Sequence, residues 1–443
     1  LVDDNGDNSR EIAAFDDERL LHPRWSPDGQ TIGAVSAITA VGVAQSIVLL
    51  GADGENPRRV PIPVDGFGVV SLSWIGAGAD VLYSQSESPA GAAVGNAGSI
   101  VHVVRQNLSS GAAERILWSP YGAQLIEVAG PGKLIFDTRS SRESLREFPL
   151  AAGGAPAGRW LTRGNSNDRQ PAYSPDGEWV IFSSNRSGNL DLWEVSVSTG
   201  AVRRVTEDAA EDWDPGFAFG GKKILWSSNR SKHFEIWLAN ADGSGARQVT
   251  RDGVDAENPS ATPDGEWIVY ASANPSKRGI WKIHPDGSGA VRLVEGEATL
   301  PETSPDGRYV AYKGSVLPES VTVRVVRLAD GAPAPMEIVI PTRNAGLAGL
   351  AGRMRWTRDG KAIAFLGQDE RGVSGIFVQD FVLGQDTAAT RRPLTAFDRE
   401  IATESFGLCP DGAHAMVASW EQVSSLVFAD KVGGVLPPLR PAK

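Results

Sequence analysis

Residues 168–208 read DRQPAYSPDGEWVIFSSNRSGNLDLWEVSVSTGAVRRVTED, and this stretch decides the fold. It predicts four short strands: one that ends at the turn 174–177, then 178–183, 190–197 and 201–206. Asp-Gly and Asn/Ser/Gly clusters between β-branched and aromatic runs are the strongest local signal for hairpins. One such sheet cannot cover both of its apolar faces, so copies of it must stack on each other.

Copies of this unit recur along most of the chain. They are marked by the turn motif Ser-Pro-Asp-Gly or a close variant, which occurs at 26–29, 262–265, 304–307, 357–360 and 409–412. The central copies follow one another about every 44 residues, the length of a four-stranded propeller blade. The sequence therefore predicts an all-β protein built from repeated four-stranded antiparallel sheets.

The turn motif, followed by an apolar strand and by Leu-Trp or Ile-Trp in the third strand, resembles the TolB-type β-propeller repeat. The resemblance implies one closed β-propeller over residues 1–443. We count nine repeat units and expect eight or nine blades, within residues 17–430, followed by a tail at 431–443. It implies little about function, because such propellers serve as scaffolds, sensors, peptidase gates and lyases.

The ring is predicted to be closed by the N-terminus. Residues 8–15 (NSREIAAF) resemble the fourth-strand pattern at 203–206 and 391–397, whereas the last repeat supplies only three strands. A strand within residues 1–16 can therefore complete the last blade, which removes exposed sheet edges.

Bulk properties exclude several classes of protein. The formal net charge is −11, and no basic stripe is present, which opposes nucleic-acid binding. No apolar run is long enough to cross a bilayer, so no membrane insertion by this segment is expected. The chain has one cysteine and begins with Leu1 rather than Met, and we expect it to be part of a longer protein.

Catalytic motifs are absent from the sequence. There is no G-x-S-x-G nucleophile elbow, no kinase motif and no phosphate-binding loop. The five histidines are scattered without zinc-ligand spacing. We expect no catalytic residues, no bound metal and no cofactor, and therefore not an enzyme.

The candidate site is the channel mouth, where the residues just before each first strand should gather. Convergent polar groups around a concavity suit a protein, peptide or small-molecule ligand. Acidic groups at Asp212, Asp214, Glu257 and Glu404 leave a calcium ion at the rim as an alternative. The predicted ligand-binding residues are His22, Arg24, Arg169, Gln170, Asp214, Glu257, Asn258, Arg353 and Glu404.

Two functions remain open. The first is a noncatalytic binding domain, either sensor or scaffold. The run at 391–428 is similar to the last blades of propellers attached to bacterial receptor-type serine/threonine kinases and winged-helix regulators, which implies a periplasmic or extracellular location. The second is a propeller enzyme of the polysaccharide-lyase type, in which His22, Arg24, Arg169 and Arg353 would gather at the channel mouth.

Overall fold

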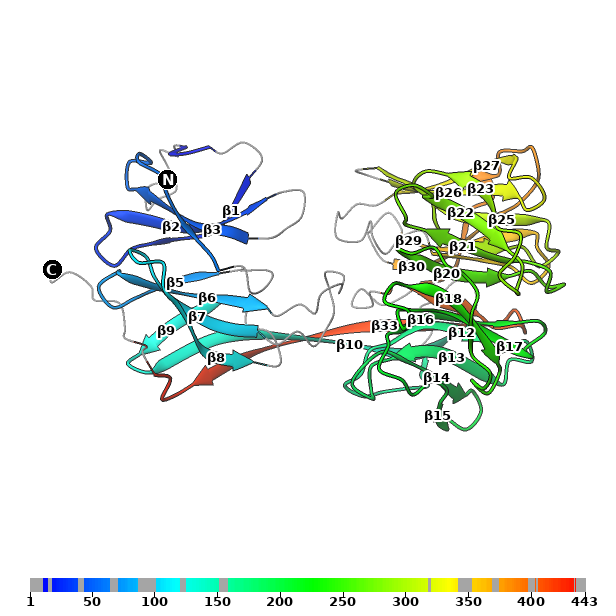
Figure 1. The fold of residues 1–443 in the computed structure, drawn as a ribbon, viewed down its shortest axis with the longest axis horizontal. Helices are drawn as coiled ribbons and strands as arrows, with labels where there is room; N and C mark the ends of the chain where they lie inside the picture. Colours follow the sequence, from blue (N-terminus) through cyan, green and yellow to red (C-terminus); the bar gives the residue numbers. More distant parts are fainter. Residues whose placement is uncertain are drawn as a thin grey trace. The chain divides into compact units, whose positions relative to one another are not determined.

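The described chain forms two compact units. Unit 1 comprises Leu1–Ser141 and Gln422–Lys443, and unit 2 comprises Arg142–Glu421 (Figure 1). The sequence analysis expected a single domain instead. The computed structural model describes residues 11–14, 18–38, 44–63, 71–86, 101–119, 125–150, 158–317, 320–341, 353–368, 374–396, 403, 405–433 and 435.

Within these residues the secondary structure is almost entirely strand. One short 3-10 helix, η2 (Ala388–Thr390), is the exception. No described helix has the length and apolar character required to span a membrane. The all-β class expected from the sequence is confirmed.

Unit 2 contains five four-stranded antiparallel sheets whose strands pair in sequence order, here numbered sheets 1 to 5. They are sheet 1, β12 (Asp168–Tyr173), β13 (Trp179–Ser184), β14 (Asp191–Ser196) and β15 (Val202–Arg204); sheet 2, β16 (Asp212–Ala218), β17 (Lys223–Ser228), β18 (Glu235–Asn240) and β19 (Arg247–Gln248); sheet 3, β20 (Ala256–Ala261), β21 (Ile268–Ser272), β22 (Gly279–Ile283) and β23 (Val291–Glu295); sheet 4, β24 (Thr299–Thr303), β25 (Tyr309–Leu317), β26 (Ser320–Arg327) and β27 (Pro333–Pro341); and sheet 5, β28 (Met354–Trp356), β29 (Ala362–Gln368), β30 (Ser374–Asp380) and β31 (Arg392–Ala396).

A sixth sheet in unit 2 combines strands from both ends of the unit. Its order is β11 (Arg159–Trp160), β10 (Lys133–Pro149), β33 (His414–Ala429) and β32 (Phe406–Leu408). Strands β10 and β33 are long, and both cross the boundary between the units. We call the part of this composite sheet that lies in unit 2 sheet 6. Strands β32 and β33 come from the end of the unit, whereas β10 and β11 come from its beginning.

Hydrophobic clusters join each sheet of unit 2 to the next and sheet 6 to sheet 1. Every second residue of a strand faces the same neighbour. In β13, for example, Val180 and Phe182 pack on sheet 6, and Ile181 packs on sheet 2. The six clusters therefore connect the six sheets in a cycle. Each cluster contains residues of two neighbouring sheets: Ile181 and Trp226, Leu225 and Tyr270, Val269 and Val310, Val323 and Phe365, Leu366 and Val417, and Met416 and Phe182.

The repeated turn motif has a simple physical basis. In sheet 1 the carboxylate of Asp176 accepts hydrogen bonds from the Ser174 hydroxyl and from the backbone N–H of Glu178. Gly177 follows at φ +78°, a backbone conformation that favours glycine. The Ser174 hydrogen bond lowers the pKa of Asp176. The same contacts recur at Asp28, Asp264, Asp306 and Asp359.

Unit 1 contains two four-stranded sheets. Sheet A consists of β1 (Glu18–Trp25), β2 (Thr31–Ile38), β3 (Ala44–Gly51) and β4 (Arg58–Pro61). Sheet B consists of β5 (Leu72–Ile75), β6 (Asp80–Ser86), β7 (Val101–Asn107) and β8 (Ala113–Ser119). Sheet B packs on sheet A through one cluster, and through a second on β9 (Ile126–Gly130) and the unit 1 parts of β10 and β33.

The closing strand predicted at residues 8–15 is wrong. The last repeat pairs with β10 and β11 instead. Of the predicted segment, residues 11–14 are described and form no strand, and Ile12 and Ala13 pack on sheet A against Ile32 and Val48. Strands β9 to β11 and strands β32 and β33, which the count of nine repeat units assigned to the third and the ninth unit, are thus parts of one composite sheet. The described chain forms eight sheets.

Candidate channel site of unit 2

The first strands of sheets 1 to 4 share a bulge at one position. The pairing with the second strand shifts register there. The residue in the bulge has a left-handed backbone, with φ between +50° and +57° for Gln170, Asp214, Asn258 and Leu300. Residues other than glycine rarely adopt this conformation, and where they do it often marks a functional position. Each of the four is followed by proline.

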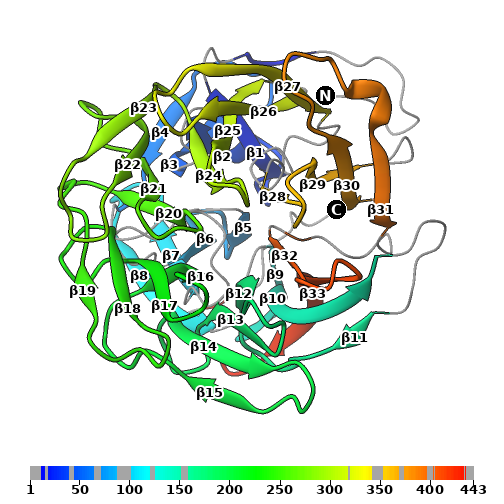
Figure 2. The ribbon, with the colours of Figure 1, turned by 90° about the vertical axis from the view of Figure 1, so that its right-hand side faces the viewer.

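The bulge residues line a cavity of about 290 Å³. All residues that line it belong to unit 2, and every one of the six sheets contributes. Figure 2 shows the first strands β12, β16, β20, β24, β28 and β32 around the centre of unit 2. The cavity is therefore the central channel of this unit. Its polar lining consists of Gln170, Tyr173, Asp214, Asn258, Ser260, Glu302, Thr303, Arg353 and Arg355.

Side chains at the bulge position are linked from sheet to sheet. The backbone N–H of Gln170 donates to Ser405 Oγ at 3.0 Å, and that of Asp214 donates to Gln170 Oε1 at 3.0 Å. Asn258 Nδ2 donates to the carboxylate of Asp214. These contacts hold the bulge residues of neighbouring sheets in a fixed arrangement on one side of the channel.

An ion pair crosses the channel. Arg353 Nη2 lies 2.8 Å from Asp214 Oδ1, and the two side chains are 13% and 8% exposed. Asp214 belongs to sheet 2 and Arg353 directly precedes β28 of sheet 5. These two sheets are three steps apart in either direction around the cycle, so the pair connects opposite sides of the channel.

Two predicted site residues, Arg169 and Glu257, lie before the bulge and do not line the cavity. Arg169 Nε is 3.0 Å from Glu143 Oε2, and its guanidinium stacks over the Trp213 ring. Burial, then the charges of Asp214 and Asp255, raise the pKa of Glu257 to about 7, although Arg353 acts in the opposite direction. Glu257, which immediately precedes the cavity residue Asn258, thus changes charge near neutral pH.

Replacing Glu257 with Gln should stabilise the protein in a pH-dependent manner. A carboxyl group with a raised pKa in the folded state stabilises that state below its unfolded pKa, and the contribution is lost as the pH rises through 7. We expect the free energy of unfolding of Glu257→Gln to match that of the wild type at pH 4. At pH 8 it should exceed the wild-type value by up to about 3 kcal/mol.

Urea unfolding of both proteins at the two pH values measures this difference. Glu178→Gln is the matched control, because Glu178 is an exposed glutamate of the same unit. An equal effect of Glu257→Gln at pH 4 and pH 8 would contradict the pKa assignment.

Sequence reasoning missed a second pair of cavity residues, Arg355 and Glu302. Arg355 Nη1 lies 3.2 Å from Glu302 Oε2. Burial raises the pKa of Glu302, although Arg355 and Arg353 act to lower it. Glu302 lies two positions after the bulge residue Leu300. Arg355 lies two positions after Arg353, which occupies the equivalent position in sheet 5. Alternation along the strand places both on the channel side. That spacing is the signal that identifies them.

The remaining predicted residues lie elsewhere. His22 and Arg24 belong to β1 of unit 1 and do not line the cavity of unit 2, although His22 has the same left-handed backbone, φ +48°. Glu404 lies outside the described residues.

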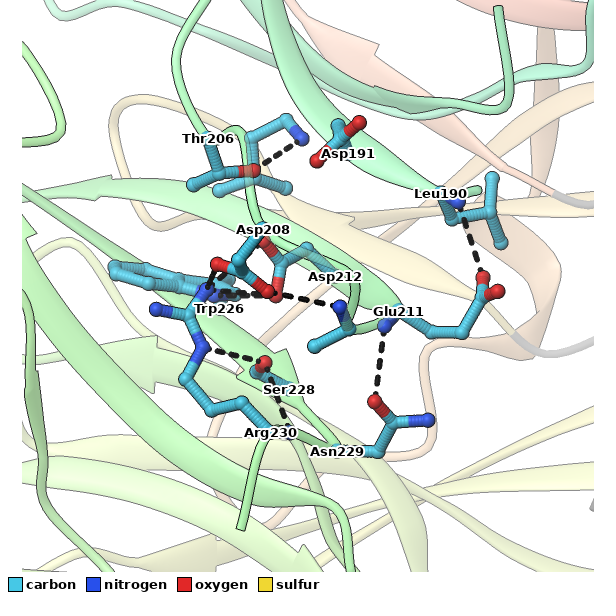
Figure 3. Close-up of polar contacts among 12 residues, drawn as sticks. Leu190, Asp191, Thr206, Asp208, Glu211, Asp212, Trp226, Ser228, Asn229 and Arg230 are labelled. Carbon is cyan, nitrogen blue, oxygen red and sulfur yellow. Dashed lines mark hydrogen bonds and ion pairs between the residues drawn. The ribbon is translucent and has the colours of Figure 1, made fainter. Parts of the chain in front are cut away.

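Two of the acidic residues considered for a calcium ion, Asp212 and Asp214, are each paired with an arginine. Asp212 is fully buried and is bound by Trp226 Nε1 and by Arg230 (Figure 3). Asp214 pairs with Arg353. Within the described residues no group of three His, Cys, Asp or Glu side chains is placed to hold a metal ion.

The cavity can supply hydrogen bonds, two guanidinium groups and an apolar wall. The wall is formed by Phe217, Trp356 and Leu408. The described lining residues include no histidine, cysteine or lysine, and the carboxyl groups among them are those of Asp214 and Glu302. Such a lining suits recognition of a polar or charged group attached to an apolar part.

Comparisons with known proteins agree with this architecture over part of the chain. An uncharacterized protein of Agrobacterium fabrum is 27% identical over 198 residues, which are 42% of this chain and 58% of that protein. An uncharacterized peptidase of Bacillus subtilis is 27% identical over 170 residues, which are 38% of this chain and 22% of the peptidase. The chain thus spans less than two thirds of either relative.

A solved structure designated TolB, from Agrobacterium tumefaciens, has a TM-score of 0.49 and 19% sequence identity, and the alignment covers 63% of this chain and 99% of that one. Residues 118–305 match the family model described as the TolB beta propeller domain. This segment contains sheets 1 to 3. The resemblance to the TolB-type repeat that the turn motif predicted is therefore confirmed over that segment.

Proposed function

We propose that unit 2 is a closed six-bladed propeller whose channel binds a ligand without catalysis. The observation that carries the proposal is the cavity of about 290 Å³, which residues of all six sheets line and into which five of these sheets direct polar side chains. Ligand sites in proteins are typically concave, with a few fixed polar groups on an apolar wall. The ligand is a protein segment, a peptide or a small molecule.

The geometry of the lining supports binding by a preformed site. Four bulge residues hold a left-handed backbone, and hydrogen bonds between sheets fix Gln170, Asp214 and Asn258. A rigid site loses little conformational entropy when its ligand binds. Backbone strain of this kind persists where the surrounding structure enforces it.

As part of this proposal the domain acts as a sensor or scaffold in a larger bacterial signalling protein, on the periplasmic or extracellular side. The match of residues 118–305 to the TolB propeller domain supports the location, because TolB-like domains are periplasmic in bacteria. The attachment to a receptor-type kinase or a winged-helix regulator is the part of the proposal that rests on the sequence of the run at 391–428.

An enzymatic function is the alternative, because the Bacillus subtilis relative is designated a peptidase. A lyase that acts on acidic polysaccharides would need the basic residues predicted at the channel mouth. Of those, only Arg353 lines the cavity. Incubation with uronic-acid polymers checks this alternative, since a lyase generates unsaturated products that absorb ultraviolet light.

Blocking the cavity should abolish ligand binding. Gly216 lines the cavity, and a Cβ added there meets no atom within 4 Å, so Gly216→Phe can fill the channel without a backbone clash. Peptides selected from a random display library on the wild-type protein are then titrated by fluorescence anisotropy. We expect at least a tenfold loss of affinity, about 1.4 kcal/mol.

Gly433→Phe is the matched control, because Gly433 is exposed in unit 1 and is also surrounded by open space. It should leave affinity unchanged. If no peptide is recovered, or if both variants bind as the wild type does, the channel is not the binding site.

A further inference from the structure

Arg355 has hydrogen-bonding capacity that the protein itself does not use. Its Nη1 donates to Glu302 Oε2 and to the backbone carbonyl of Met354. Among the described residues, its Nε and Nη2 have no hydrogen-bond partner. The side chain is 20% exposed and lines the cavity. A guanidinium that presents Nε and Nη2 side by side is suited to bind a carboxylate through two parallel hydrogen bonds.

The charges around Arg355 favour an anion. The carboxylate of Asp214 is already bound by Arg353 and Asn258. Glu302 is the other acidic lining residue, and burial raises its pKa. Of the two lining guanidinium groups, that of Arg353 is bound by Asp214, whereas that of Arg355 contacts Glu302 through Nη1 alone.

Apolar groups beside these cations limit the size and nature of the ligand. Trp356 and Leu408 line the same cavity, and its volume is near the lower limit for small-molecule sites. The group that enters is therefore small, with an apolar stem next to its charged end.

We propose that the channel of unit 2 binds a carboxylate group carried on a short apolar stem, and that Arg355 anchors it. This inference rests on the proposed function and names the ligand chemistry of the same site. The incoming carboxylate accepts hydrogen bonds from Nε and Nη2 of Arg355 while Nη1 keeps its contact with Glu302.

Succinate and succinamide test the proposal as a matched pair of probes, since they differ in charge but little in shape. The full chain is labelled with 15N-arginine, and the Nε–H signal that disappears in Arg355→Gln is assigned to Arg355. With succinate this signal should shift and saturate at pH 7.5. Succinamide at the same ionic strength should leave it unchanged. An absent shift, or equal shifts with both probes, overturns the proposal.

Variants test the anchor itself. Arg355→Lys keeps the charge but loses the paired donors, and it should weaken succinate binding about tenfold. Arg327→Gln is the control, because Arg327 is exposed and does not line the cavity. It should bind as the wild type does. Equal affinity of Arg355→Lys and wild type removes Arg355 as the anchor.

Two further probes distinguish the source of the carboxylate. N-acetyl-Ala-Ala with a free C-terminus, compared with its C-terminal amide, tests a peptide terminus, whereas succinate represents a free acid. If neither acid shifts the Arg355 signal while selected peptides still bind in a manner sensitive to Gly216→Phe, the carboxylate inference fails and the proposed function stands. If binding is also insensitive to Gly216→Phe, both fail.

Discussion

Residues 142–421 produced as a separate polypeptide are expected to fold and to unfold in one cooperative transition. This range contains β11, β32 and the unit 2 parts of β10 and β33, which together form sheet 6, and six clusters join the sheets of the unit in a cycle. Each sheet of the separate polypeptide would therefore keep the two sheets of unit 2 on which it packs. We expect a melting temperature within about 5 °C of the corresponding transition in the full chain, measured by circular dichroism and calorimetry.

A polypeptide of residues 161–421 is the matched comparison. It lacks the unit 2 parts of β10 and β11, and with them Leu145 and Phe148, which are fully buried on either face of sheet 6. Loss of each buried side chain costs about 1.5–3 kcal/mol. We expect a melting temperature at least about 10 °C lower, or no cooperative transition. Equal stability of the two polypeptides would show that β10 and β11 do not close the ring.

Replacing Asp212 with Ala should be among the most destabilising single substitutions in unit 2. Asp212 is fully buried and accepts hydrogen bonds from Trp226 Nε1 and from Arg230 Nη2, each at 3.0 Å (Figure 3). Arg230 also donates to Ser228 Oγ and pairs with Asp208. Without Asp212, the buried indole N–H loses its partner, and the Arg230 guanidinium loses one of its two carboxylates. A buried pair broken from one side costs about 3–5 kcal/mol.

Urea unfolding of Asp212→Ala and of Asp242→Ala measures this effect. Asp242 lies in an exposed turn and binds the neighbouring Ser244, so its replacement should cost less than about 1 kcal/mol. Similar losses for the two variants would mean that the buried network contributes little to stability.

The sequence predicted local structure well because turn chemistry and strand alternation are local properties. The motif at 174–177 forms the hydrogen-bonded turn that Asp and Gly favour, and 178–183 becomes a strand buried on both faces. It also aligned Gln170, Asp214 and Asn258 at equivalent positions before a proline in successive repeats, although it did not predict the bulge in which the structure places them. Each of these features depends on a few consecutive residues.

The partner of the last repeat was missed for a physical reason. Residues 159–162 (RWLT) follow the same fourth-strand pattern as 203–206 (RRVT), and so do residues 8–15 in part. Such a pattern indicates the position of a strand within a sheet. It does not indicate which sheet the strand joins, because that depends on packing between segments hundreds of residues apart.

The cavity residues were predicted in part for a related reason. Gln170, Asp214, Asn258 and Arg353 were predicted and line it. Arg169 and Glu257 immediately precede the bulge, and the change of register separates them from the cavity. Arg355 and Glu302 are identified only when alternation is counted from the bulge rather than from the turn.

Sheet 6 combines strands from both ends of unit 2, and this determines the order in which the sheets can form while the chain is synthesised. Its two halves are joined by contacts such as that between Arg142 and Glu421, which are 279 residues apart in the sequence. Contacts across so long a separation form late, because the entropy of loop closure must first be overcome. Sheets 1 to 5 can therefore assemble during translation, whereas β10 and β11 must wait for β32 and β33 to emerge. Until then the nascent protein exposes Phe148 and Leu145, and this interval is when it would most need a chaperone.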